Sequence, residues 1–374
     1  MIGQRKQNYT KGNNLIFQGG AKMLPYMVVA LWPLIVYSIF TKGKIVIGEK
    51  EINFYWYVIL AMLPMFIMIG FRSGNLGADT NGYLNNFIYV NSTPFSEVLE
   101  TSRMEKGYLI FVKLITYITK YPLVYQLICT FIYFIGVLEF AKTLDKKDVF
   151  LFIFFVCTLG LFFFMFTGVR QSLAMSICLF GYKYSQRRKI IPFILCVLLA
   201  FCFHKSAILF IVVYFMVKMK VTWYNTVAYA VGLWIVTTYL FDIQEWFNEQ
   251  LEYDYGVEKT NSGGIFVIIL ALLTVFSMVM IYNNHKFNKD IQAFMNINFI
   301  TVFFWLLRLQ TRVAERPSMY FMFMSCALYA YGLNCIKNNQ QRFIFKFIII
   351  VLSMLFYVYR LNYSYSGLVP YKFY

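Results

Sequence analysis

Short polar motifs interrupt an otherwise apolar chain, and their side chains are of types that perform group transfer. Arg170 and Gln171 lie in "FTGVRQSLA", His204 and Lys205 lie in "AFCFHKSAILF", and Asp79 lies in "RSGNLGADTNGY". A guanidinium near the start of a helix forms an anion site, because it adds to the backbone donors there. A carboxylate or an imidazole can remove a proton from a hydroxyl group. The set therefore suits a reaction in which a phosphorylated group leaves and a hydroxyl group attacks.

Further charged residues extend this set. Arg72 follows a long apolar run, and Glu105 opens the motif "EKGY". Arg308, Arg312 and Arg316 recur at every fourth position, which would place them on one face of a helix. Like charges at this spacing repel each other, so we expect an acidic loop, lipid headgroups or a phosphorylated substrate to compensate them.

Each of these residues also has a purely structural interpretation. Arg170 could reach the membrane surface from a hairpin turn, and His204 could be a hydrogen-bonded core residue. Asp79 could cap a helix or stabilise a turn. The arginine row could bind lipid headgroups alone. The sequence leaves these interpretations open beside the functional ones.

Composition places these groups in a membrane protein. The chain is 60% hydrophobic and 21% aromatic with only 14% charged residues, which exceeds the apolar content of a soluble domain. A spanning helix needs about 20 apolar residues, and its backbone must satisfy its own hydrogen bonds. Apolar stretches that predict spanning helices are residues 24–40, 54–71, 123–140, 149–166, 221–241, 265–282, 291–307, 319–335 and 343–359.

Residues 169–219 hold further apolar length, divided by "QRRK" and by His204. They predict three more helices, of which the last two are short and meet at His204. The fold class that follows is an all-α, polytopic transmembrane helical bundle of roughly 11 to 13 helices. Residues 1–374 form a single integral membrane domain in this interpretation.

The formal net charge of +17 has a distribution that argues against nucleic-acid binding. Lys and Arg gather in short connections such as "LDKKD", "QRRK" and "KMK", a pattern that places those connections in the cytoplasm. Alternation then puts the polar motifs, an acidic loop at residues 242–263 and the N-terminus outside. Residues 72–121 form another outer loop, in which residues 105–120 have the pattern of an amphipathic helix on the membrane interface.

Arginines without a metal site suit a pyrophosphate leaving group, because fixed cations stabilise the charge that develops on it. The cysteines lie in or beside apolar runs without CxxC spacing, so they indicate neither a metal site nor a disulfide framework. A base that activates a sugar hydroxyl completes the requirements of lipid-linked glycosyl transfer. The sequence therefore predicts a metal-independent membrane glycosyltransferase without a cofactor.

The motifs "RSGNLGADTNGY", "EKGY", "GVRQSLA", "FHKSA" and the terminal "PYKFY", in this order, resemble the EpsG-like branch of Wzy-type polysaccharide repeat-unit polymerases. The resemblance implies a GT-C-like fold at the outer face of the bacterial cytoplasmic membrane. It implies transfer of a growing glycan from undecaprenyl pyrophosphate to the non-reducing end of a lipid-linked repeat unit. It also implies a lipid-linked oligosaccharide as donor and as acceptor, with a flippase and a chain-length regulator as further partners.

The motifs and the resemblance together define a candidate site. We expect Arg170, supported by Arg312 or Arg316, to bind the donor pyrophosphate and Asp79 or His204 to activate the acceptor hydroxyl. The candidate catalytic residues are Asp79, His204, Glu105 and Arg170, and the candidate substrate-binding residues are Arg72, Tyr83, Tyr108, Gln171, Lys205, Arg308, Arg312 and Arg316.

Other functions share part of this chemistry. A lipid-linked glycan ligase uses the same donor and differs in its acceptor. A polyprenyl-phosphate-dependent glycosyltransferase would carry acidic residues in its first outer loop, which Asp79 does not exclude. A lipid-linked oligosaccharide flippase or transporter would also hold cations in a cavity, and central charges or internal repeats would indicate it.

Overall fold

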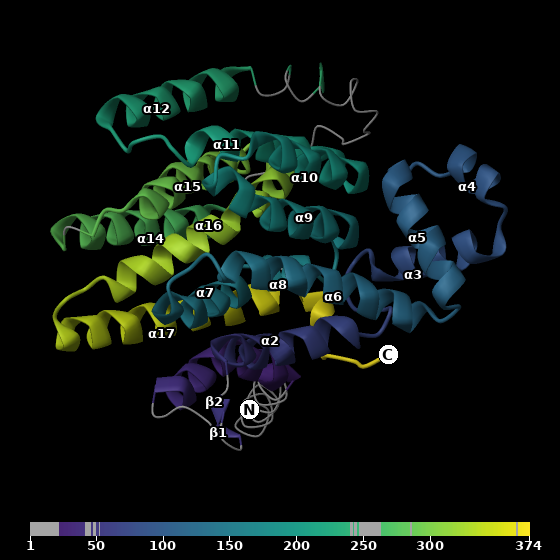
Figure 1. Ribbon diagram of the computed structural model, residues 1–374, viewed down its shortest axis with the longest axis horizontal. Helices are drawn as coiled ribbons and strands as arrows, with labels where there is room; N and C mark the ends of the chain where they lie inside the picture. The colour runs from purple at the N-terminus through teal and green to yellow at the C-terminus, as the bar shows by residue number, and fades with distance from the viewer. Residues whose placement is uncertain are drawn as a thin grey trace, which may run out of the picture.

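A computed structural model describes residues 22–41, 46–47, 50–51, 53–239, 242, 245–246, 263–284, 286–363 and 366–374. Over these residues the protein is a bundle of α-helices stacked in layers (Figure 1), as the sequence predicts. The strands there, β1 (Val46–Ile47) and β2 (Lys50–Glu51), form one short antiparallel hairpin. The predicted acidic loop lies almost entirely outside the described residues.

The helices follow the apolar stretches of the sequence closely, with short 3₁₀ turns between some of them. The described α-helices are Lys22–Thr41, α2 (Phe54–Gly70), α3 (Thr80–Ser92), α4 (Phe95–Thr101), α5 (Lys106–Ile118), α6 (Pro122–Ala141), α7 (Lys146–Thr158), α8 (Leu161–Phe164), α9 (Val169–Gln186), α10 (Ile190–Phe203), α11 (Val212–Met216), α12 (Trp223–Thr238), α14 (Gly264–Asn283), α15 (Lys289–Leu307), α16 (Glu315–Asn334) and α17 (Asn339–Tyr363), and the 3₁₀ helices are η1 (Lys205–Ile211), η2 (Arg312–Ala314) and η3 (Ser366–Leu368).

Five helices of the described part are long and apolar enough to cross a membrane: Lys22–Thr41, α6, α14, α15 and α17. Three more apolar segments, namely α2, α10 and η1 with α11, are shorter. α7 and α16 lie in the interior, and almost every one of their side chains is buried. The protein is therefore a multi-pass membrane protein whose central helices face other helices rather than lipid.

Residues 149–166 do not form the single helix that the sequence predicts. α7 ends at Thr158, and Gly160 has φ +105°, a conformation that strongly favours glycine. The guanidinium of Arg360 occupies the space where a Cβ at Gly160 would lie. The single turn of α8 follows, and Gly168 then begins α9. The break directs the chain toward the start of α9, where the candidate site lies.

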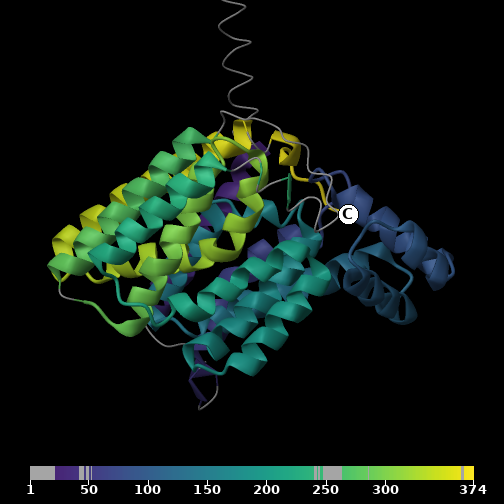
Figure 2. The same cartoon turned by 90° about the horizontal axis from the view of Figure 1, so that it is seen from above.

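The two ends of the bundle differ in character. At one end the basic connections contact each other: Asn334 Nδ2 donates to Lys147 O over 2.9 Å, and Gln186 Nε2 donates to Asp290 Oδ1 over 3.2 Å. At the other end lie α3, α4, α5 and the C-terminus, on the right in Figure 1 and projecting from the bundle in Figure 2. Helices of the bundle such as α9 and α10 run between these ends in opposite directions, whereas α3, α4 and α5 stay at one end (Figure 1).

The segment 72–121 has more structure than the predicted loop with one amphipathic helix, because α3 and α4 precede α5. α5 buries Tyr108, Leu109 and Val112 in a cluster that includes residues of α3 and α6. Ile118, at the end of α5, is 77% exposed. α5 therefore has apolar residues on its exposed face as well as on its buried face.

The contact between α6 and α9 requires a glycine. A Cβ at Gly136 would lie 2.6 Å from Ser176 Cα, which belongs to the backbone and cannot rotate away. We expect Gly136→Val to separate these helices and to lower the free energy of unfolding by about 1 to 3 kcal/mol. Thermal unfolding of the detergent-solubilised protein measures the change. Gly232→Val in α12 is the control, since nothing lies within 4 Å of its added Cβ; equal melting temperatures for both variants would contradict the prediction.

Candidate active site

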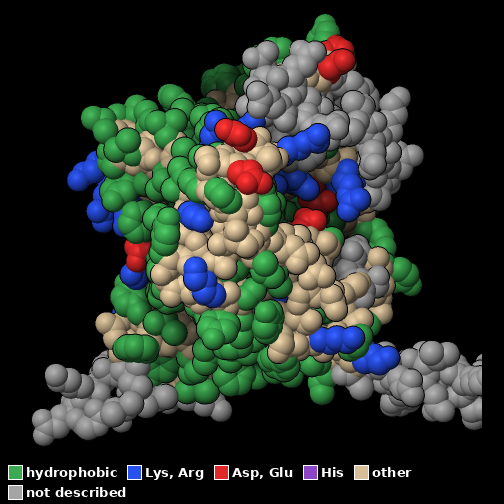
Figure 3. Space-filling model, turned by 90° about the vertical axis from the view of Figure 1, so that its right-hand side faces the viewer, with side chains coloured by type: hydrophobic (Ala, Val, Ile, Leu, Met, Phe, Trp, Pro, Cys, Tyr) green, Lys and Arg blue, Asp and Glu red, His purple; other side chains and the backbone are tan. Residues whose placement is uncertain are grey.

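A polar cavity of about 70 Å³ lies at the end of the bundle that carries α3 to α5. Figure 3 shows this end, where Lys and Arg side chains gather near several acidic ones. The cavity lies where α3, the connection from α8 to α9, the end of α10 and the start of α16 meet. Its lining residues are Asp79, Tyr83, Phe164, Thr167, Gly168, Arg170, Gln171, His204 and Arg316. Residues from separate motifs therefore line a single cavity.

Arg170 lies in the first turn of α9 and forms an ion pair with Glu105, at the N-cap of α5. Its Nε also donates to Tyr83 OH over 3.5 Å. The Glu105 side chain is 5% exposed and that of Arg170 is 23% exposed. Water therefore screens the attraction between the two charges only partly. Burial raises the pKa of Tyr83, and Arg170 opposes this effect. Tyr83 therefore stays a neutral phenol beside the cation.

Glu105 also holds the end of α10. Its Oε1 lies 3.5 Å from His204 Nδ1 and accepts a hydrogen bond of 3.4 Å from the backbone N–H of Lys205. One carboxylate therefore joins a guanidinium and an imidazole from different helices. Both carboxylate oxygens of Glu105 therefore contact neighbouring groups.

A close approach of α5 to α10 makes this geometry possible. A Cβ at Gly107 would lie 2.7 Å from the carbonyl oxygen of Cys202. Glycine at this position lets the start of α5 come near the end of α10, which brings Glu105 next to His204. Gln171 connects α9 to α16, because its Nε2 donates a hydrogen bond of 2.6 Å to Arg316 O.

Asp79 lies at the mouth of the cavity, directly before α3. Its side chain is exposed and makes no capping hydrogen bond to α3. Asp79 therefore occupies the N-cap position of α3 without capping the helix through its side chain. Its carboxylate is placed where a molecule in the cavity could meet it.

The start of α9 adds partial positive charge to the cavity. Gly168 is the N-cap residue and has no side chain to accept from the first N–H groups of the helix. Gly168 and Thr167 both line the cavity. Uncapped N–H groups and the dipole of a long helix favour an anion at such a position. Thr167 was not predicted as a lining residue, although Gly168, directly before the helix, is a signal of close backbone approach.

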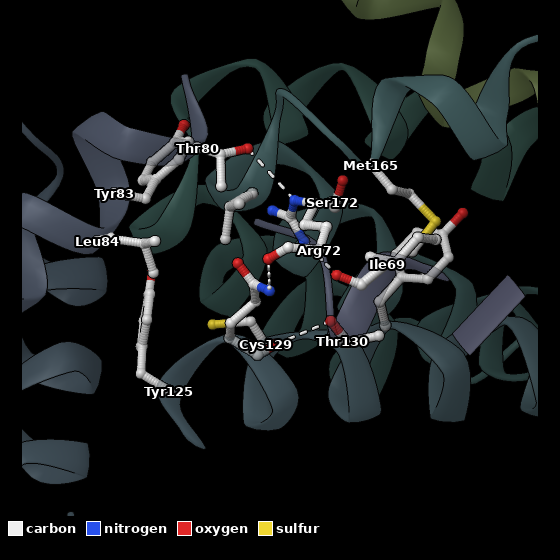
Figure 4. A pocket seen from close by; sticks show the side chains of 13 residues that line it. Ile69, Arg72, Thr80, Tyr83, Leu84, Tyr125, Cys129, Thr130, Met165 and Ser172 are labelled. Carbon is white, nitrogen blue, oxygen red and sulfur yellow. Dashed lines mark hydrogen bonds between the residues drawn. The ribbon is translucent and has the colours of Figure 1, made fainter. Parts of the chain in front are cut away.

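Arg72 lies outside this cavity, and its contacts with other protein groups (Figure 4) indicate a structural role. It is 2% exposed, and its Nη1 and Nε donate to Ile69 O over 2.5 Å and to Thr80 Oγ1 over 3.3 Å. It lines a separate cavity of about 20 Å³. Its backbone pairs with Phe373, and Gln126 Nε2 donates to Arg72 O over 2.9 Å. Arg72 therefore anchors the loop that leads to Asp79.

The structure places other candidate residues away from the cavity lining. Tyr108 is fully buried and shares a 2.6 Å hydrogen bond with Tyr125 OH, so no face of its ring is open to a sugar. The three arginines of the predicted row do not share one helical face, because the helix ends between them. Arg308 is the C-cap of α15 and forms an ion pair of 3.1 Å with Glu315, Arg312 lies in η2, and Arg316 lies in the first turn of α16.

Arg316 is thus the member of that row that lines the cavity. Lys205 follows His204 at the start of η1 and contributes its backbone N–H to Glu105. Within the described residues, no group of three or more His, Cys, Asp or Glu side chains is placed to hold a metal ion.

These features define a multi-pass helical membrane protein with a charged cavity at one end of its bundle. The model of the EpsG family matches residues 55–373, a range that includes every residue of the cavity. The chain belongs to the EpsG family, which confirms the resemblance seen in the motifs and indicates a role in exopolysaccharide synthesis. No curated protein and no solved structure matches the chain.

The bridging role of Glu105 can be tested by removing its charge. Breaking a fully buried ion pair costs about 3 to 5 kcal/mol, and the partial exposure of Arg170 makes the loss smaller here. We expect Glu105→Gln to lower the melting temperature and to reduce polysaccharide output at equal membrane abundance. Glu100→Gln is the matched control, because Glu100 is exposed in α4. If Glu105→Gln melts and functions like Glu100→Gln, the bridge does not support the site.

Proposed function

We propose that the protein is a polysaccharide repeat-unit polymerase. It transfers a growing glycan from undecaprenyl pyrophosphate to the non-reducing end of a lipid-linked repeat unit. The observation that carries this proposal is the single cavity that joins Arg170, Arg316 and the start of α9 to Asp79 and His204. The EpsG family supports the same general activity.

The cationic side of the cavity suits the leaving group. Breaking the bond to the carrier leaves negative charge on the pyrophosphate, and preorganised cations and backbone donors stabilise that charge. Arg170 and Arg316 supply guanidiniums, and α9 supplies uncapped N–H groups. The Glu105 ion pair keeps Arg170 in place before the substrate arrives, so less reorganisation is needed during the reaction.

The acceptor hydroxyl needs a base on the other side of the cavity. We assign this role to Asp79, because its carboxylate is exposed at the cavity and is not used as a helix cap. His204 is 5% exposed, and its Nδ1 faces Glu105, which fixes the orientation of the ring. His204 then serves as a polar contact for the substrate, with Tyr83 and Gln171 beside it.

The charge distribution supports an outward-facing site in the bacterial cytoplasmic membrane. The connections rich in Lys and Arg lie at the end of the bundle opposite the cavity, and such connections stay in the cytoplasm. A flippase that delivers repeat units and a chain-length regulator are the protein partners that we propose for this site. A ligase would use the same donor chemistry and is separated from a polymerase by its product.

Arg170→Ala tests the binding of the donor. Each charge-assisted contact to phosphate contributes about 1.5 to 3 kcal/mol, so we expect roughly a ten- to hundredfold loss of turnover. Cells that lack the protein, rescued with this variant, should retain single repeat units on the lipid carrier, as a gel of the labelled glycans shows. Arg187→Ala is the control, because Arg187 is exposed at the opposite end of α9.

Three outcomes would contradict the role of Arg170 or the proposed function. Full polymer output from Arg170→Lys would show that a positive charge suffices and that the guanidinium has no specific role. Long polymer that stays on the carrier in the deletion strain would identify a ligase instead of a polymerase. Single units confined to the cytoplasmic side would identify a flippase.

Asp79→Asn tests the assignment of the base. Loss of a general base lowers the rate by about a hundredfold or more, so we expect this variant to abolish long polymer without lowering the melting temperature. We expect His204→Gln to reduce polymer output less than Asp79→Asn does, because glutamine keeps a polar side chain at this position. Asp145→Asn is the control, since Asp145 is exposed at the other end of the bundle. A larger rate loss from His204→Gln than from Asp79→Asn would transfer the role of base to His204.

A further inference from the structure

An exposed apolar face of α10 leads to the cavity. Ile191, Leu195, Leu198 and Cys202 follow the helical repeat, so they share one face, and all of them are exposed. The last of them, Cys202, is the residue that Gly107 of α5 approaches. The face therefore ends at the crossing of α10 and α5.

The exposed face continues on α5. Ile110, Leu114 and Ile118 follow Gly107 at helical spacing, and all three are exposed. The rings of Phe111 and Phe203, 5.4 Å apart, pack at the crossing. An apolar surface thus runs from α10 across the crossing onto α5, and we name these exposed residues of the two helices the α10–α5 face.

Two lysines, Lys113 in α5 and Lys120 after it, are turned away from this face, whereas Lys106 is exposed at its start, where α5 begins. Lys113 Nζ donates to Val90 O over 3.1 Å, and Lys120 Nζ donates to Asn91 Oδ1 over 2.8 Å. Both acceptors belong to α3, so both ammonium groups reach toward α3. Beyond Lys106, the face of α5 carries Ile110, Leu114 and Ile118.

The crossing lies beside the charged groups of the cavity and within the depth of the membrane. Glu105 precedes Gly107, and His204 follows Cys202. The contact between the Glu105 and His204 side chains therefore lies next to the crossing. α10 has 14 residues, which corresponds to a length of about 21 Å, whereas the hydrocarbon layer is about 30 Å thick. In the orientation proposed above, the basic residues before α10 lie at the cytoplasmic surface, so the other end of α10 lies within the hydrocarbon layer.

We propose that the polyprenyl chain of the donor lies along the α10–α5 face while its pyrophosphate binds Arg170. This inference rests on the proposed function and adds the path of the lipid. Lipid chains are as apolar as leucine, so the face gains little affinity from this contact. Its effect is orientation, because a chain aligned at the crossing brings the pyrophosphate to the ion pair of Arg170 and Glu105.

Photocrosslinking in vesicles tests the path. Benzoylphenylalanine replaces Leu114 in one protein and Leu272 in a control, since these side chains are 58% and 65% exposed and Leu272 lies on α14. Both proteins are reconstituted with radiolabelled undecaprenyl pyrophosphate-linked repeat units and irradiated. We expect at least fivefold more label at position 114, and we expect unlabelled undecaprenyl pyrophosphate to displace it.

Equal labelling at the two positions, or labelling that only excess phospholipid reduces, would overturn the inference and show an ordinary lipid contact. Polymer formation by the unmodified protein in the same vesicles is measured in parallel. If that protein makes no polymer from the labelled units, the proposed function fails, whereas the ratio of labelling still decides the path of the lipid.

Discussion

The ion pair between Glu105 and Arg170 joins the segment α3 to α5 to the helix bundle, and the shape of the cavity depends on it. The same carboxylate faces His204 Nδ1, so one residue sets the relative positions of α5, α9 and α10. A partly buried charge without a partner is unfavourable in an apolar environment, which makes this connection strongly preferred. Gly107 is a condition for it, because a larger residue would hold α5 away from α10.

Two arginines near the site have different tasks. Arg72 is held by backbone and hydroxyl oxygens and by its pairing with Phe373, and it anchors the chain before Asp79. Arg170 lines the cavity, where its partner Glu105 holds its charge next to the uncapped start of α9. The architecture thus combines an anchored loop that carries a carboxylate with a preorganised group of cations. Such preorganisation suits the transfer that we propose, because fixed cations stabilise a charge that develops during a reaction.

Much of the helical fold was predictable, because spanning helices need long apolar stretches and these are visible locally. α6, α14 and α15 begin and end within a few residues of the predicted stretches. The break between α7 and α8 was not predictable, since the apolar run continues through it. It depends on Gly160 and on Arg360, a residue far along the chain. The prediction that Arg308, Arg312 and Arg316 share one helical face was wrong for a related reason. Residue spacing predicts a shared face only where the helix continues, and here it ends after Arg308.

The sequence alone determined that the protein is a helical membrane protein, which polar residues interrupt its apolar segments, and which end of the bundle is basic. These properties depend on composition and on residues close together in the chain. Only the tertiary structure decided which polar residues meet. It brings Asp79, Arg170, His204 and Arg316 to one cavity and leaves Arg72 and Tyr108 outside it. The physical reason is that those meetings depend on close helix crossings and on ion pairs between distant residues, which no local pattern encodes.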